Sequence, residues 1–491
     1  MLEGNSSLNS IFDHPKVNVD SRDYERIRES LKYYEGNYPK VIYKNSNGRE
    51  ISRVYSTINM MKKVANQYST VVFNEQCEIS VDGPASDFIK KVIEHNDLKK
   101  NFSKYLEPMF ALGGLACRPY YDSTSEQIEF SWALANAFYP LRSNTNNISE
   151  CVIPFKTTTS NGSETIYYTL LEFHEWKRDS NGKSIYIISN ELYKSKDSSI
   201  IGSRTPLNEL YDDLQETVAF NGLSRPLFTY LKPSGFNNIN PYSPLGIGVC
   251  DNCKDTLDRI NKSYDEFDQE IRTGKRRIAV SEMLLNSADE NGQVKLFFDN
   301  DEDLFQLIPG SNMDDYTIKD LTSDIRTESY ISSINHHLKT LEMETSLSSG
   351  TFTFDMNGVR STKTATEVVS ENSQTYQTRS MQITEVEKFL KELIISVCEL
   401  GKALDIYDGD IPENEDIGID FQDGAFQDKP AQLEYYLRLF SSGLIPGEMI
   451  LENVLELPEE EAKMVYSEAL RQVATRATGI FNSQGLDEEM E

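Results

Sequence analysis

"SPLGIGVCDNCKDTLDRINKSYDEFDQEIRTGKRRIAV", residues 243–280, decides the fold, because a tight turn, a long amphipathic segment and the start of a strand follow one another in it. Apolar side chains recur every three or four residues between Val249 and Ile271, which predicts a helix over 248–277. A dense basic cluster closes that helix and consists of Arg272, Lys275, Arg276 and Arg277. The cluster is either an ordinary helix end, where cations suit the macrodipole, or a contact for phosphate or an acidic partner.

A small acidic, β-rich insertion follows this helix, with Asn291-Gly292 as its hairpin turn. A second helix is then expected over 321–347, capped by Thr322 or Ser323. Within the insertion, three carboxylates match the first ligand positions of a calcium loop: Asp299, Asp301 and Asp303. The glycine and the glutamate that such a loop needs further on are absent. A solvated acidic turn is therefore the main interpretation, and a weak cation site is the alternative.

A second landmark is "TFTFDMNGVRSTKTATEVVSENSQTYQTRS", residues 351–380. A short aromatic alternation runs into an Asn-Gly turn and then into a long helix, expected over 362–404. The second half of that helix carries an apolar stripe at steps of four and three, which predicts a buried seam. The stripe is Val386, Leu390, Leu393, Val397, Leu400 and Leu404. The first half is almost entirely polar.

The flanking regions complete an α+β pattern. Helices are expected over 20–34, 53–74 and 87–112, and an antiparallel meander over 127–193, with Asn-Gly turns at 161–162 and 181–182. A short strand, "IGIDFQD" at 417–423, precedes a helical tail broken at Gly443 and Pro446.

Composition limits the class of function. A net charge of −29 over 491 residues argues against a broad basic face that grips nucleic acid. By itself the charge favours simple solubility; a surface that repels a passing polyanion is the alternative. Six cysteines are too few for a disulfide scaffold, which indicates reduced thiols in a cytosolic protein. No secretory signal and no run of about 18 apolar residues is present.

Catalytic motifs are lacking. No GxSxG, HExxH or kinase motif occurs, and Cys250 and Cys253 form a lone CxxC without further metal ligands. The adjacent pair His336-His337 cannot direct both rings to one metal on a helix. Leu245–Val249 holds a GxG without the third glycine of a dinucleotide site. We therefore expect no enzyme activity, no cofactor and no metal.

Three segments nevertheless resemble the portal proteins of tailed bacteriophages, of the type found in long-tailed phages of Gram-positive bacteria. They are "SRVYSTINMMKKVANQYSTVVFNEQCEISV" at 52–81, the opening stretch at 243–280, and "FDMNGVRSTKTATEVVSENSQTYQTRS" at 354–380. The resemblance extends over 33–457. It implies an elongated α+β subunit in a dodecameric ring at one capsid vertex. In the family's terms the parts are a wing (1–242 and 362–430), two stem helices (243–277 and 321–347), a clip (278–320), a channel loop (348–361) and a crown with an acidic tail (431–491).

The resemblance also implies roles for residues. The channel loop would present Phe352, Phe354, Asp355, Met356, Asn357, Gly358 and Arg360, on a flexible base at 348–350. From the residues alone, Phe352 and Phe354 could equally form a buried hairpin between two helices. The polar half of the long helix would face solvent or the channel. The basic cluster at 272–277 would be the exception that touches phosphate or a partner.

The implied partners are further copies of the chain, the large terminase packaging motor, a head–tail adaptor, scaffold and major capsid protein, and double-stranded DNA that passes without sequence readout. No membrane is involved. The protein would assemble in the bacterial cytoplasm and reside in the virion. The alternative is another oligomeric virion scaffold or a head–tail adaptor without an open channel.

Overall fold

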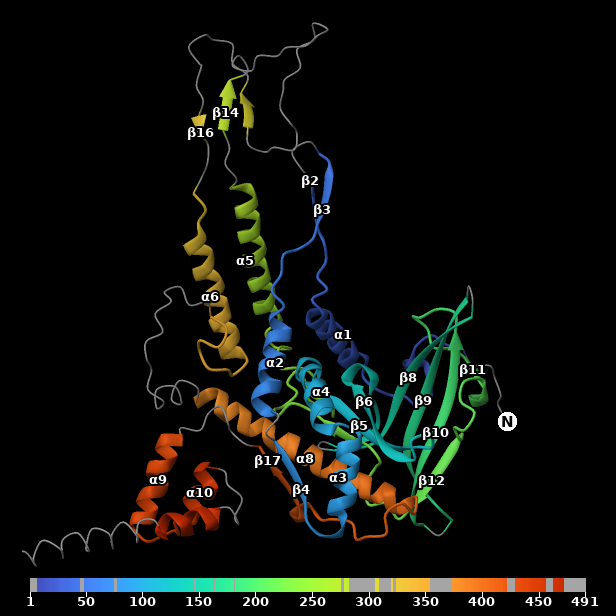
Figure 1. The fold of residues 1–491 in the computed structure, drawn as a ribbon. Helices are drawn as coiled ribbons and strands as arrows, with labels where there is room; N and C mark the ends of the chain where they lie inside the picture. The colour runs from blue at the N-terminus through green and yellow to red at the C-terminus, as the bar shows by residue number, and fades with distance from the viewer. Residues whose placement is uncertain are drawn as a thin grey trace, which may run out of the picture. The chain divides into compact units, whose positions relative to one another are not determined.

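The structure is a computed structural model that describes residues 7–44, 48–74, 77–144, 147–161, 164–180, 182–274, 278–281, 305–308, 319–320, 324–353, 373–421, 429–455 and 462–471. The chain forms two compact units. The first contains Met1–Gly358 and Asn372–Phe421, and the second contains Val359–Glu371 and Gln422–Glu491. Figure 1 shows their elements.

The N-terminal helices agree only in part with the predicted ranges. Helix α1 (Ser21–Glu35) is confirmed: the Asp20 carboxylate caps its start, and Gly36 ends it at φ +71°. Helix α2 (Met60–Val72) begins later than expected: Arg53 ends the hairpin of β2 (Val41–Lys44) and β3 (Glu50–Arg53), and residues 54–59 connect that hairpin to the helix without regular structure. Asn59 caps α2 by accepting a hydrogen bond from the Lys62 amide.

The helix expected over 87–112 is divided in two. Helix α3 (Ser86–His95) and helix α4 (Leu98–Leu112) are separated by Asp97, whose φ of +46° is left-handed and incompatible with a continuous helix. The Asn96 side chain explains the break. Its amide donates to the Ile128 carbonyl at 2.8 Å, and its Oδ1 accepts from the Phe130 amide at 2.8 Å, which ties the corner to a strand.

The predicted meander is confirmed from residue 139 on, as the centre of a seven-stranded antiparallel sheet, whereas its first expected strand, at 127–134, belongs to a smaller sheet. The strand order of the seven-stranded sheet is β1-β11-β10-β9-β8-β7, with β12 also pairing β10. The strands are β1 (Ser7–Leu8), β7 (Tyr139–Ser143), β8 (Ile148–Asn161), β9 (Glu164–Arg178), β10 (Ser184–Ser195), β11 (Gly202–Thr205) and β12 (Thr217–Asn221). A smaller sheet orders β13-β5-β6, from β5 (Leu115–Asp122), β6 (Gln127–Leu134) and β13 (Thr229–Leu231).

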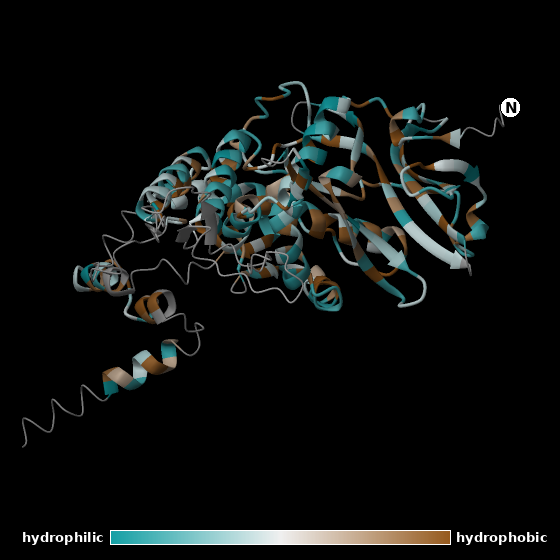
Figure 2. Ribbon diagram, turned by 90° about the horizontal axis from the view of Figure 1, so that it is seen from above, coloured by the Kyte–Doolittle hydropathy of each residue, from teal (hydrophilic) through white to brown (hydrophobic). Residues whose placement is uncertain are grey.

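Helix α8 (Ser373–Ala403) lies in the core, and its apolar seam is confirmed. Val386, Leu390, Leu393, Val397 and Leu400 are each at most 3 % exposed. Figure 2 shows hydrophobic and hydrophilic residues mixed along single elements, as expected for elements with one buried face. The part of the long helix predicted before residue 373 lies outside the described residues.

The expectation was that the polar half of this helix faces solvent or the channel; in its described part, 373–382, one face is exposed and the other is buried. Thr375, Thr378, Arg379 and Gln382 are buried, at the spacing that continues the apolar seam. Arg379 donates from Nε to the Val71 carbonyl at 2.8 Å, and Gln382 accepts from the Ser234 amide at 2.9 Å. The buried Arg379 and Gln382 side chains thus satisfy a carbonyl in the last turn of α2 and an amide of the irregular segment after β13.

Two helices run side by side away from the core and lead to a small mixed sheet (Figure 1). They are α5 (Lys254–Thr273) and α6 (Thr327–Glu344), called the α5–α6 pair below. The sheet contains β14 (Ile278–Ser281), parallel to β15 (Phe305–Ile308) and antiparallel to β16 (Lys319–Asp320). The predicted turn at Asn291-Gly292 lies outside the described residues.

Both helices of the pair begin later than predicted. Residues 248–253 form turns before α5, and Arg326 rather than Thr322 or Ser323 precedes the first turn of α6, without a side-chain cap. The predicted strand at 417–423 is confirmed as β17 (Ile417–Asp420), which pairs β4 (Glu78–Val81). In the second unit, α9 (Lys429–Ser441) and α10 (Glu448–Leu455) flank the predicted break at Gly443 and Pro446.

All six cysteines are buried and free. Within the described ranges, no group of side chains could hold a metal ion, and no helix has the length and apolar character needed to span a bilayer.

Candidate functional site at the α5–α6 pair and its loop

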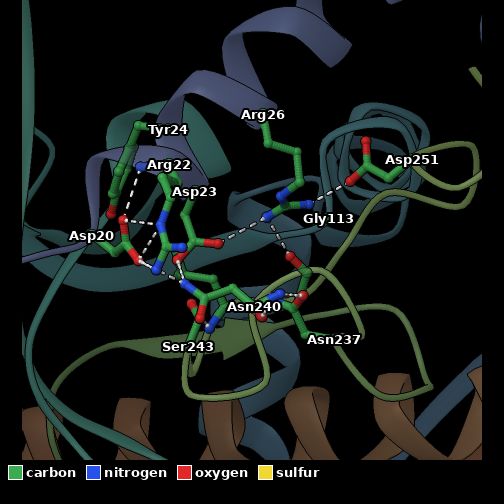
Figure 3. A network of polar contacts seen from close by, with 12 residues as sticks. Asp20, Arg22, Asp23, Tyr24, Arg26, Gly113, Asn237, Asn240, Ser243 and Asp251 are labelled. Atoms are coloured by element: carbon green, nitrogen blue, oxygen red, sulfur yellow. Dashed lines mark hydrogen bonds and ion pairs between the residues drawn. The ribbon is translucent and has the colours of Figure 1, made fainter.

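A buried ion pair fixes the start of the α5–α6 pair (Figure 3). The Asp251 carboxylate accepts hydrogen bonds from Arg26 Nη1, from the Ser30 hydroxyl and, at 2.7 Å, from the Gly248 amide. Arg26 uses Nη2 to donate to the Gly246 carbonyl at 2.9 Å. Neither side chain is more than 6 % exposed. This arrangement ties α1 to the turn that precedes α5, across 225 residues of sequence.

The same joint explains the lone GxG motif. A Cβ atom on Gly248 would lie 2.2 Å from the Ala111 carbonyl oxygen, and one on Gly246 would lie 2.5 Å from that of Gly113. The backbone of this turn therefore packs directly on the end of α4, where the Val249 amide also donates to the Phe110 carbonyl at 2.9 Å. These glycines allow the backbone of the turn to approach the end of α4 closely, and they do not form a nucleotide site.

The loop before the joint is held by side-chain amides (Figure 3). Asn240 donates from Nδ2 to Asp20 at 3.1 Å and to Asp23 at 3.0 Å, and Asn237 donates to the Leu245 carbonyl at 3.0 Å. The pKa of Asp20 falls to about 2, chiefly because Arg22 donates hydrogen bonds to it. The segment that enters α5 is thus fixed on the first turn of α1.

The two helices of the pair are joined at their far end by an ion pair. Arg326 donates to the Glu270 carboxylate from its backbone amide and from Nε, both at 3.0 Å, and again from Nη2. These hydrogen bonds lower the pKa of Glu270 to about 2. The rings of Phe267 and Tyr330 stack beside this ion pair, with centroids 5.3 Å apart. The far end is therefore held by both charge and packing.

The buried carboxylate of Glu342 anchors the loop that leaves α6. It is 1 % exposed and accepts hydrogen bonds from the amides of Gly350 at 2.9 Å and Phe352 at 2.6 Å. Ser348 and Thr375 bond reciprocally: the Ser348 amide donates to Thr375 Oγ1 at 2.9 Å, and the Thr375 amide donates to Ser348 Oγ at 3.1 Å. The loop base is therefore attached to both α6 and α8.

This geometry corrects one expectation and leaves others untested. The base at 348–350 was expected to be flexible, but Ser348 is buried and hydrogen-bonded. Phe352 is half-buried against the main core. The remaining predicted loop residues lie outside the described residues: Phe354, Asp355, Met356, Asn357, Gly358 and Arg360.

Of the predicted basic cluster, only Arg272 is described. It is exposed and donates to the Gln269 side chain at 2.9 Å. Lys275, Arg276 and Arg277 lie outside the described residues, as do the candidate calcium ligands Asp299, Asp301 and Asp303.

Sequence reasoning missed the residues that hold this site, chiefly Asp251 and Glu342. The sequence around each of these two residues contains a pattern that could have indicated its role. Glu342 follows Leu338 by four residues and so lies on the apolar face of α6, whereas Asp251 sits between two apolar cysteines. A carboxylate in an apolar stripe indicates a buried anchor for backbone amides.

One series of hydrogen-bonded side chains resembles catalytic machinery, but it is buried and a substrate cannot reach it. His174 bonds Tyr186 through Nδ1 at 2.7 Å and Glu172 through Nε2 at 2.8 Å, while Arg118 pairs with Glu172 at 2.8 Å. His174 and Tyr186 are 0 % exposed and Glu172 is 4 % exposed. These groups satisfy one another inside the sheet, which is the usual arrangement of a buried structural network.

One cavity of the first unit is also unlike an active site. It measures about 690 Å³ and lies between α8 and the strand β13; among the described residues that line it there is no histidine and no cysteine. Its charged lining includes Arg225, Lys232, Glu385 and Glu392.

Comparison with known families identifies the chain. A family model described as "Phage portal protein, SPP1 Gp6-like" matches residues 13–473, so the chain belongs to this family. No curated protein matches the sequence. Membership makes the chain a phage portal protein of a structural family, which implies a homo-oligomeric ring associated with the virion capsid.

The buried ion pair predicts a large stability effect. Asp251→Ala leaves the buried Arg26 guanidinium with only the more distant Asp23 carboxylate, at 3.9 Å, as a charged partner, so we expect the free energy of unfolding to fall by up to about 3–5 kcal/mol. Urea denaturation of the variant measures this loss. Asp255→Ala, which removes an exposed carboxylate in the first turn of α5, should cost less than about 1 kcal/mol. Equal losses in both variants would contradict the assignment.

The loop anchor predicts a local effect. Glu342→Gln replaces one accepting oxygen by an NH2 group, so one of the Gly350 and Phe352 amides loses its partner, at a cost of about 1–3 kcal/mol. Hydrogen exchange at those two amides should accelerate, while exchange in α5 stays unchanged. Glu344→Gln, two residues away and exposed, is the control. Unchanged exchange in Glu342→Gln would remove the anchor role.

The Arg326–Glu270 pair predicts a pH dependence. The pKa of Glu270 is about 2 in the folded protein, against an ordinary 4.5 in the unfolded chain. Between these two pH values the unfolded chain therefore binds more protons than the folded protein. The stability that the pair supplies is complete above about pH 4.5 and is lost as the pH falls toward 2. The stability difference between the native protein and Glu270→Gln should therefore shrink across that window in denaturation at fixed pH. Glu328→Gln, an exposed carboxylate on α6, should show no such convergence.

Proposed function

We propose that this portal-family chain forms a ring at one capsid vertex, through which double-stranded DNA is packaged and later ejected. The family match over 13–473 carries the proposal, because it spans the α5–α6 pair, the loop that follows it and α8. In this proposal the pair is the stem, 278–320 is the clip, 348–361 is the channel loop and 431–491 is the crown. The wing comprises 1–242 and 362–430.

The anchored loop base supports a constriction at the channel. A loop that touches moving DNA transmits force to its ends, and Glu342 and Thr375 fix the beginning of this loop on two helices. Between 348 and 361 the only charged residues are Asp355 and Arg360. Low charge limits adhesion to a polyanion, while Phe354 and Met356 supply bulk.

The overall charge of the chain supports a ring through which DNA passes without being retained on the wall. Each copy contributes −29, and a ring multiplies that charge around the axis, which repels phosphates and lowers their residence on the wall. The cluster of Arg272, Lys275, Arg276 and Arg277 is the local exception. It would contact phosphate or an acidic partner at the junction of stem and clip.

The proposed partners follow from the two ends of the ring. The clip would dock the large terminase motor during packaging and the head–tail adaptor afterwards, while scaffold and major capsid protein meet the wing. ATP hydrolysis belongs to the motor, since the sequence has no phosphate-loop motif. A head–tail adaptor or scaffold without an open channel is the second candidate.

Negative-stain electron microscopy with mass photometry tests the architecture. The proposal expects closed rings with a central hole, at about a dozen times the 56.0 kDa subunit mass. A stable small oligomer without a hole would favour the adaptor. ATP hydrolysis by the pure protein would contradict the proposal that a separate motor protein hydrolyses ATP.

The loop makes a separable prediction. Phe354→Ala should leave ring assembly and thermal stability intact and reduce DNA packaged per motor turnover several-fold, because the loop loses bulk. Phe352→Ala should also lower stability, since Phe352 packs against the core. A packaging assay with purified capsids, with Phe354→Leu as the bulk-preserving control, measures the first effect. Loss of rings in Phe354→Ala would instead indicate that Phe354 is a buried packing residue.

A further inference from the structure

We infer that the β2–β3 hairpin is an arm that packs on the far end of the α5–α6 pair of the neighbouring copy in the ring. The inference rests on the proposed function, because it needs a second copy at a fixed rotation. The arm comprises residues 41–44 and 48–54. Its docking surface, the pair's far end, comprises residues 264–274 and 324–330.

The base of the arm is fixed on α5 of its own chain. Arg53, the last residue of β3, makes a bidentate ion pair with Asp265, with both contacts at 2.6 Å. The Ser56 amide donates to the same carboxylate at 3.0 Å, and the Ser56 hydroxyl donates to Asp268 at 2.9 Å. The direction in which the arm leaves α5 is therefore set.

The arm itself has no cover in its own chain. Among the described residues 41–44 and 48–54 none is buried, and Ile42 and Val54 are 64 % and 75 % exposed. In the part of the chain that the structure describes, β2 and β3 pair only with each other. A lone two-stranded hairpin is marginally stable in water. An anchored arm with exposed aliphatic side chains therefore calls for an external surface.

The far end of the α5–α6 pair offers such a surface. Tyr264, Ile271 and Ile325 are exposed there by 36 %, 46 % and 39 %. Ile325 lies over the end of α5, with its Cγ1 3.1 Å from where a Cβ on Gly274 would be. These side chains are apolar, as are those of the arm, and would be covered by the same contact.

The charges of the two surfaces are opposite. The arm and the residue before it carry exposed cations at Lys40, Lys44 and Arg49 against one acid, Glu50, in a chain that is strongly acidic overall. The far end holds six acidic residues, among which Glu266, Asp324 and Glu328 are exposed, against two cations, Arg272 and Arg326. Opposite charge around an apolar centre is the usual composition of a specific protein contact.

Ring symmetry explains why the partner surface is this one. In this inference the ring axis runs along the α5–α6 pair. A rotation about that axis does not change the position of a residue along it. An arm therefore meets the part of the next copy that lies at the same position along the axis. The arm starts from Asp265, and Figure 1 draws it level with the C-terminal end of α5, on the side opposite α6. The level part of the next copy is its far end. Such a head-to-tail contact closes into a ring.

Disulfide trapping tests the contact. Two differently tagged chains, one with Ile42→Cys and one with Ile325→Cys, are assembled together into rings and treated with oxidised glutathione, which accepts the two thiol hydrogens. The six native cysteines are buried and give little background. We expect covalent dimers that carry both tags. Ile406→Cys, a 43 % exposed isoleucine elsewhere, replaces Ile42→Cys in the control and should give none.

The outcomes separate the two levels of the proposal. Rings without mixed dimers, for Ile42 or Val54 paired with Ile271 or Ile325, would overturn the arm contact and leave the ring intact. A chain that forms no rings would overturn the ring and the arm together. As a second readout, Ile42→Asp with Val54→Asp should raise the concentration at which rings dissociate at least tenfold, whereas Ile406→Asp should not. An unchanged dissociation concentration would contradict the inference.

Discussion

The ion pair between Arg26 and Asp251 is the constraint around which the first unit is arranged. Removing two charges from water is costly, and further hydrogen bonds to the two groups offset part of that cost. Here these partners are the Ser30 hydroxyl, the Gly248 amide and the Gly246 carbonyl, whereas Arg26 Nε is buried without a partner. These groups belong to α1 and to the turn before α5, so both must take one relative position. The glycines then allow the end of α4 to pack against that turn, and the α5–α6 pair leaves the core in a defined direction.

A second set of buried polar groups performs the same task for the loop. Glu342, Thr375 and Gln382 bond amides of irregular segments, and Arg379 bonds a carbonyl in the last turn of α2, where helical carbonyls lack partners. Such segments are costly to bury unless their amides and carbonyls are satisfied. The buried polar side chains of α8 thus continue its apolar seam with different chemistry. In one half of the helix apolar side chains pack against apolar neighbours, and in the other half polar side chains form hydrogen bonds with backbone groups.

Local patterns predicted the elements whose causes are local. The Asp20 cap and the Gly36 end identified α1, alternating residues identified the meander, and the leucine seam identified the buried half of α8. The misses have causes distant in sequence. The Asn96 corner bonds a strand more than thirty residues on, and the buried polar stripe of α8 bonds residues such as Val71 and Ser234. The loop was identified from its composition and its resemblance, whereas Glu342, which holds it, required knowledge of what α6 faces.

The separation between Arg26 and Asp251 also bears on the order of events at the ribosome. The guanidinium is made 225 residues before its carboxylate, which at about 5–20 residues per second amounts to roughly 11–45 s of translation. Until Asp251 emerges, the Arg26 guanidinium has only Asp23 of its own helix as a charged partner, at 3.9 Å. The joint between α1 and the turn before α5 can therefore be completed only after that turn has been made, whereas the packing of α1 on α4 can form earlier.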